Sequence, residues 1–87
     1  MAFKVLLHKK AGKELNKLQE DIKRRIASTL KEMEDDPFVG DIVPMEGIDA
    51  VFRRRIGEYR IVYTVDFTAR IVLVLRIGPR GKVYKGL

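Results

Sequence analysis

Arginine side chains recur along two neighbouring segments in the second half of the chain. Arg53 and Arg55 belong to the segment Val51–Ile56, and Arg60 belongs to Tyr59–Val65. A guanidinium group is permanently charged, and its planar fork of donors can hold two oxygens of one phosphate. Arginines gathered in this way could bind a polyanion.

The charge of the chain is concentrated in the same half. Residues 51–87 contain nine Lys or Arg and two acids, a charge of +7, whereas residues 1–50 contain nine bases and ten acids, a charge of −1, which together give +6. A one-sided basic excess on a small domain is typical of a surface that binds nucleic acid.

Length and composition limit the other function classes. The 87 residues suffice for a single domain, and the absence of cysteine excludes disulfides and thiolate metal sites. No apolar run approaches the ~20 residues that span a bilayer, so we expect a cytoplasmic protein with no membrane partner. The sole histidine, His8, is expected to be a structural or surface residue. A single histidine and scattered acids do not favour a metal site, and no cofactor is expected.

Hydrophobic spacing predicts the elements of the first half. The segment Phe3–Leu7 is typical of a short buried strand. A helical stripe follows at Ala11, Leu15, Leu18, Ile22, Ile26, Leu30 and Met33, and Pro37 ends it. An unbroken helix would be about 40 Å long, in a domain about 30 Å across. We therefore predict a break at Gln19–Asp21, with Glu20 or Asp21 capping the second helix of an antiparallel pair.

The second half predicts a loop and three antiparallel strands. Prolines and glycines favour a loop over residues 37–48. Gly57-Glu58 favours a type II′ hairpin between Val51–Ile56 and Tyr59–Val65, so that Arg55 stands opposite Arg60 and Arg53 opposite Val62. The third strand is expected at Ile71–Ile77.

Alternation along the strands divides the side chains between two faces. One predicted face receives the helices and contains Phe52, Ile56, Tyr59, Ile61, Tyr63, Val65, Ile71, Leu73, Leu75 and Ile77. The other carries Arg53, Arg55 and Arg60, joined by Arg76 if three or five unpaired residues connect the last strands. Arg54 falls on the apolar face, which suggests an edge strand where its charged end reaches water.

Arg55 directly opposite Arg60 would be destabilising, and a bound phosphate or a partner's carboxylate would relieve the repulsion. The alternative is that the arginines splay into solvent. After the last strand, Lys82, Tyr84 and Lys85 could hold a phosphate and stack on a base, or form a tail that contacts a protein partner.

The predicted succession of a strand, a helix hairpin and a loop, followed by the segments Phe52–Tyr63 and Arg76–Tyr84, resembles the RelE toxins of the RelE/ParE superfamily. Their most specific part is Tyr59-Arg60 with Tyr63, preceded by the basic strand. The resemblance covers the whole chain and implies a single toxin domain over residues 1–87. Its fold would be α+β: an N-terminal strand, a helix hairpin and a three-strand meander, with the helices on one face of a curved sheet.

The resemblance also implies an activity, ribosome-dependent cleavage of messenger RNA in the A site by attack of the 2′-hydroxyl. Its catalytic residues would correspond to Arg53, Arg55, Arg60, Arg80 and Tyr84, with Arg76, Lys82 and Lys85 binding RNA. Guanidinium groups can stabilise the charge of the transition state. Tyr84 would act as general base or stack on a nucleotide. RelE toxins often have lysine at the positions of Arg53 and Arg55, and arginine cannot serve as a base.

Two other functions fit the same sequence. A ParE-type toxin shares this fold and inhibits DNA gyrase by protein contact, and a noncatalytic nucleic-acid-binding module would need the basic face alone. Either kind of toxin implies an acidic, RelB-like antitoxin in a hetero-oligomeric complex, covering the exposed sheet face or an apolar groove beside the helices.

Overall fold

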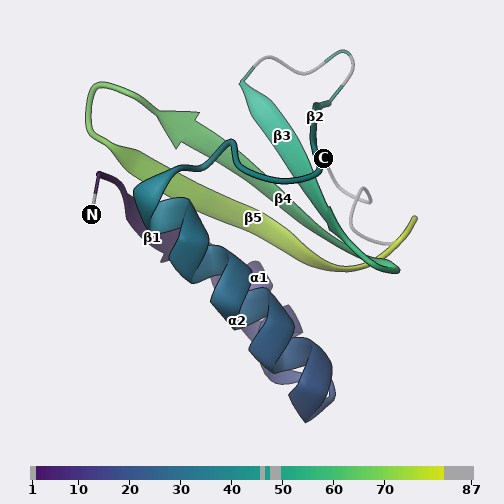
Figure 1. Cartoon of the computed structure of the whole chain (residues 1–87). Helices are drawn as coiled ribbons and strands as arrows, with labels where there is room; N and C mark the ends of the chain where they lie inside the picture. Colours follow the sequence, from purple (N-terminus) through teal and green to yellow (C-terminus); the bar gives the residue numbers. More distant parts are fainter. Residues whose placement is uncertain (1, 46, 48–49, 82–87) are drawn as a thin grey trace.

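A computed structural model describes residues 2–45, 47 and 50–81 (Figure 1). Its elements in chain order are β1 (Lys4–Leu7), α1 (Lys9–Asn16), α2 (Glu20–Asp35), β2 (Ile42–Pro44), β3 (Val51–Ile56), β4 (Tyr59–Asp66) and β5 (Ile71–Pro79). Among the described residues, five strands form one sheet in the order β1-β5-β4-β3-β2, in which β1 is parallel to β5 and the other pairs are antiparallel. The predicted α+β architecture is confirmed.

The helices divide where the sequence predicts. The side chain of His8 caps α1 by accepting a hydrogen bond from the backbone N–H of Lys10 at 3.2 Å. The predicted cap of α2 is wrong, because Gln19 is the N-cap, and within the described residues its side chain makes no capping hydrogen bond. Glu20 and Asp21 lie instead in the first helical turn, where their charges favour the helix dipole. None of the described helices is long and apolar enough to cross a membrane.

The helices cover one face of the sheet (Figure 1). Ala11 of α1 and Ile26 and Met33 of α2 are buried against strand residues that include Ile61 and Val74. Pro37 ends α2 as predicted, because the residue before a proline is pushed towards extended geometry and Asp36 has φ −151° and ψ 111°. The interior thus combines a helical stripe of period 3.6 with alternate strand residues.

The β3–β4 hairpin has the predicted register. Arg55 pairs with Arg60 and Arg53 with Val62. Gly57 has φ +59°. Among the described non-glycine residues, φ is positive at Ala50 and Arg70 but not at Glu58, so Glu58 has the negative φ of a type II′ turn.

The β4–β5 pairing differs from the prediction in two ways. Asp66 pairs with Ile71, so the connection has four residues rather than three or five, and a bulge lies beside Val62 and Tyr63. The four-residue connection places Val72 and Val74 on the helix face, where the sequence predicts Ile71, Leu73 and Leu75. The bulge then returns Ile77 to the helix face, and Leu75 packs with Val51, Val62 and Met45 in a separate cluster.

The predicted loop over residues 37–48 contains the short strand β2. Val43 pairs with Arg53, so β3 is not at the edge of the described sheet. Pro44 is tolerated because an edge strand can leave its outer side without an N–H donor. The predicted exposure of Arg54 is therefore wrong: its side chain is 15% exposed and donates to the carbonyl of Val39 at 2.6 Å.

Candidate active site: an arginine-lined hollow

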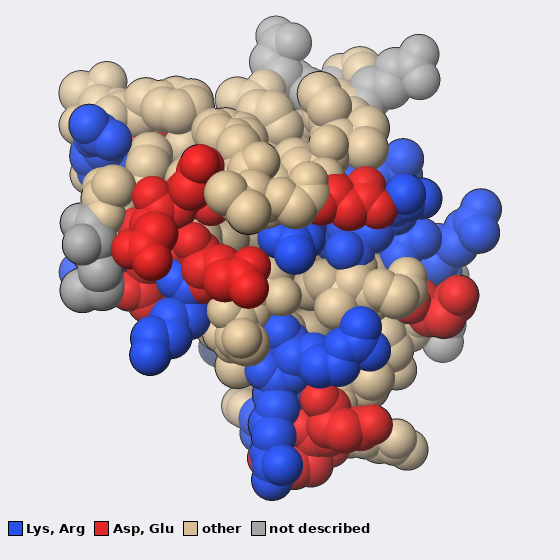
Figure 2. All heavy atoms as spheres, in the orientation of Figure 1, with Lys and Arg blue, Asp and Glu red and all other residues tan. Residues whose placement is uncertain are grey.

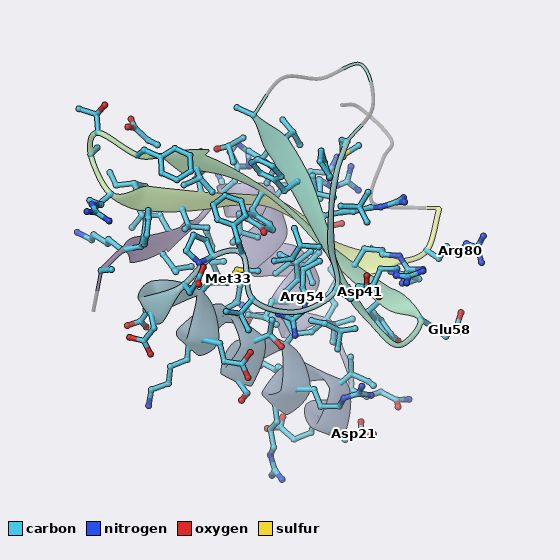
Figure 3. The ribbon with its side chains drawn as sticks, turned by 45° about the horizontal axis from the view of Figure 1, so that its top comes forward. Asp21, Met33, Asp41, Arg54, Glu58 and Arg80 are labelled. Carbon is cyan, nitrogen blue, oxygen red and sulfur yellow. The ribbon has the colours of Figure 1, made fainter. Side chains whose placement is uncertain are left out.

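A small hollow lies at the turn end of the β3–β4 hairpin. Its volume is about 140 Å³, and its lining residues are Arg53, Arg55, Arg60 and Arg80. Figure 2 shows Lys and Arg gathered at this end of the sheet, whereas a group of Asp and Glu lies over the C-terminal end of α2. In Figure 3, Arg80, Glu58 and Asp41 lie at this same end. The structure thus brings together four of the five residues proposed as catalytic from the sequence.

Arg60 is the most buried of these arginines. The residue is 7% exposed, and its Nη1 donates to the carbonyls of Gly57 and Tyr59, both at 2.9 Å. Carbonyl acceptors satisfy donors without cancelling the charge, so the guanidinium retains its attraction for anions. A buried cation held in this way has little side-chain freedom left to lose when it binds a phosphate.

An acidic residue extends the row of opposed residues across the sheet. Arg60 pairs with Gly78 on one side and with Arg55 on the other. Asp41 lies next in the row, beyond Arg55, and its carbonyl accepts from the backbone N–H of Arg55 at 2.9 Å. The Asp41 carboxylate accepts from Arg55 Nε at 2.7 Å and lies 2.6 Å from its Nη2. The repulsion between the opposed arginines is therefore relieved within the chain itself, a solution that the sequence argument did not consider.

Arg76 does not line the hollow. Its Nε and Nη2 donate to Glu14 of α1 at 3.1 to 3.3 Å, and the backbone N–H of Ile77 donates to the same carboxylate at 3.1 Å. The Arg76 side chain is 10% exposed. Its guanidinium thus ties α1 to β5, although the sequence places it among the RNA-binding residues.

Comparison with known proteins agrees with the fold. Residues 5–84 match the family described as ParE toxin of type II toxin-antitoxin system, parDE. A Methanocaldococcus jannaschii sequence that carries the name toxin RelE1 is 31% identical over 88 residues, covering 98% of both chains. The chain belongs to the RelE/ParE family of type II toxins. The resemblance inferred from the sequence is confirmed.

Solved structures share the fold of the toxin. In the archaeal RelE–RelB complex of Pyrococcus horikoshii, a chain 29% identical superposes with a TM-score of 0.83, covering 94% of the toxin and 99% of that chain. In the RelBE toxin–antitoxin complex of E. coli, a chain 22% identical gives a TM-score of 0.78, covering 90% of the toxin and 96% of that chain, and at that identity the match supports the fold alone.

Tyr63, part of the sequence signature, has a structural role in the toxin. It is fully buried, and its hydroxyl donates to the carbonyl of Pro37 at 2.6 Å. Burial raises the pKa of Tyr63 to about 12; Arg54 works against this shift and Asp36 adds to it. Tyr63 therefore anchors the chain after α2 to the centre of the sheet, away from the hollow.

The remaining predicted site residues, Lys82, Tyr84 and Lys85, lie outside the described residues. Sequence reasoning missed Asp41 and Glu14, the carboxylates that pair with Arg55 and Arg76. The branched pair Ile42-Val43 beside Asp41 was a signal for a short strand. For Glu14 there was no local signal, because its partner lies 62 residues further along the chain.

Proposed function

We propose that the toxin is a ribosome-dependent endoribonuclease that cleaves messenger RNA in the ribosomal A site. One observation carries this proposal: Arg53, Arg55, Arg60 and Arg80 surround one hollow. A small space lined by several arginines suits a group whose negative charge grows during a reaction. A phosphodiester under attack by a neighbouring hydroxyl is such a group.

In the proposed reaction, the 2′-hydroxyl oxygen forms a bond to the adjacent phosphorus, and the bond to the 5′-oxygen breaks. The products are a 2′,3′-cyclic phosphate and a 5′-hydroxyl, and the proton lost by the attacking hydroxyl is balanced by the one gained by the leaving oxygen. Arg60, buried and held by carbonyls, would stabilise the phosphorane. Arg80, which is exposed, would complete the charge around it. Tyr84 would accept the first proton or stack on a base.

An antitoxin is part of the same proposal. The solved relatives from Pyrococcus horikoshii and E. coli are named as complexes of RelE with RelB. An acidic segment would complement the basic end of this toxin and prevent RNA from reaching the hollow. We expect the toxin and its antitoxin to copurify as a hetero-oligomeric complex in the cytoplasm.

The decisive experiment mixes the purified toxin with ribosomes programmed with a defined message and maps the new RNA ends. Wild-type toxin should cut within the A-site codon, and Arg60→Ala and Tyr84→Ala should each lower the rate at least about tenfold, a range typical of lost electrostatic or proton-transfer groups. Glu20→Gln, which alters an exposed ion pair on α2, is the matched control. Intact message with the wild-type toxin would refute the proposal.

The ParE description of the matching family supports a second candidate, inhibition of DNA gyrase by protein contact. A supercoiling assay separates the two proposals. Gyrase inhibition by wild-type toxin together with intact message on ribosomes would favour this second function. Arg60→Ala would then affect inhibition only if the basic end of the sheet contacts gyrase.

A further inference from the structure

Asp41 places a carboxylate on one of the arginines that line the hollow. Its Oδ2 accepts from Arg55 Nε at 2.7 Å and lies 2.6 Å from Nη2, so a single oxygen engages one edge of the guanidinium. A phosphate oxygen binds arginine through the same donors. The carboxylate therefore occupies positions that a phosphate could take.

The backbone fixes this contact. The pairing of Ile42 with Arg54 continues by one residue, and the backbone N–H of Arg55 donates to the carbonyl of Asp41. Asp41 therefore remains beside Arg55 whatever its side chain binds. Since directly opposed residues of antiparallel strands hold their side chains close together, the carboxylate could separate from Arg55 and return without any change in the sheet.

The contact also has the exposure of a replaceable one. The Arg55 and Asp41 side chains are 51% and 47% exposed, and ion pairs at such positions contribute little to stability. Arg60 differs, because it is buried and its Nη1 is held by neutral carbonyls. Of these two arginines, Arg55 is thus the one whose partner solvent or a ligand can exchange.

We propose that Asp41 is an internal substitute for a phosphate: it neutralises Arg55 in the unbound toxin and is displaced by an RNA phosphate when RNA binds. This inference rests on the proposed function, because it requires RNA at the arginine-lined hollow. Asp41 would then limit affinity for free RNA, since each binding event must first break an existing ion pair. Removing its charge should let Arg55 neutralise a phosphate without competition.

The test compares Asp41→Asn with Glu20→Gln. Each substitution removes one negative charge and one exposed ion pair, but Glu20 pairs with Arg24 on α2. The probe is a single-stranded RNA with 2′-O-methyl groups, which cannot be cleaved by 2′-hydroxyl attack, and its binding is measured by fluorescence anisotropy. Asp41→Asn should bind about two- to fivefold more tightly at low salt, the range that exposed ion pairs are worth.

Asp41→Asn should also change the salt dependence. The slope of log affinity against log salt, measured between about 50 and 200 mM, should steepen by up to about 0.7, the value for one additional phosphate on a single strand. Glu20→Gln should leave the slope unchanged. In an Arg55→Gln background, Asp41→Asn should have no further effect, because the guanidinium for which Asp41 and RNA compete is absent.

Equal affinity and slope for Asp41→Asn and Glu20→Gln would overturn the inference while leaving the proposed function intact. Weaker binding by Asp41→Asn would overturn it too, by showing that the carboxylate positions Arg55 for RNA. If Arg60→Ala binds the probe as tightly as wild type, RNA does not occupy the hollow, and the inference and the RNA site of the proposed function both fail.

Discussion

Replacing Glu14 by Ala should destabilise the toxin far more than the loss of an ordinary surface ion pair. The Glu14 carboxylate accepts from Arg76 and from the backbone N–H of Ile77. Without it, a buried N–H loses its acceptor, which costs about 1–3 kcal/mol. The Arg76 side chain, 10% exposed, also loses the counter-charge that Glu14 supplies. Removing one partner of a fully buried pair costs about 3–5 kcal/mol.

Glu14 is not fully buried, which lowers the expected value. Its side chain is 24% exposed, so water partly replaces the lost carboxylate. We expect Glu14→Ala to lower the free energy of unfolding by about 2–3 kcal/mol, between the cost of an unpaired N–H and that of a broken buried pair. Glu14→Gln should lose about 1 kcal/mol, because its amide oxygen still accepts from Ile77.

Urea unfolding followed by circular dichroism measures these losses, with Glu20→Ala as the control. The Glu20 and Arg24 side chains are 69% and 78% exposed, and their pair, together with the interaction of Glu20 with the helix dipole, should contribute about 1 kcal/mol or less. Should Glu14→Ala and Glu20→Ala have the same stability, the tie between α1 and β5 would have no energetic role.

Three further predictions concern the packing of the core and of the chain that follows α2. An unfolded tyrosine ionises near pH 10 whereas folded Tyr63 stays neutral to about pH 12, so the free energy of unfolding should fall by roughly 2–3 kcal/mol over that interval. Tyr63→Phe should lack this drop. Parallel pH profiles of stability for the wild type and Tyr63→Phe would contradict the raised pKa of Tyr63. Gly40→Ala should cost about 2–4 kcal/mol in urea unfolding, because residue 40 has φ +103° and a Cβ would overlap the Arg54 guanidinium. The control Gly12→Ala, in an open helical position, should stabilise the toxin by about 0.5–1 kcal/mol. Ile26→Ala should lower the free energy of unfolding by about 2–5 kcal/mol, because Ile26 is fully buried in the core. Val39→Ala, at a half-exposed position, should lower it by under about 1 kcal/mol. Similar losses for the two variants would contradict the packing.

Local features allowed the β3–β4 hairpin to be predicted in detail. A two-residue turn that begins with Gly57 leaves few registers, and each register determines which side chains are opposed. Arg55 opposite Arg60 follows from that turn alone. The break between the helices was also predictable, because an unbroken helix would have been longer than the domain.

The errors come from features that depend on distant parts of the chain. The bulge beside Val62 and Tyr63 changes which strand residues face the helices, and nothing in the local sequence marks it. The strand β2 is stabilised by pairing with β3, and its proline obscured it. Its presence buries Arg54 and places Asp41 beside Arg55, so one missed strand accounts for the errors at both arginines.

The pairing of β1 with β5 has a consequence for how the toxin is made. Lys4 pairs with Ile71, so the sheet joins segments from nearly opposite ends of the chain, and such high contact order slows folding. A nascent chain can form the β3–β4 hairpin early, but β1 has no partner strand until β5 has been synthesised. Arg80 follows β5 and lines the hollow. The ribosome that translates this protein therefore carries an incomplete site until Arg80 has been added and the N-terminal strand has docked.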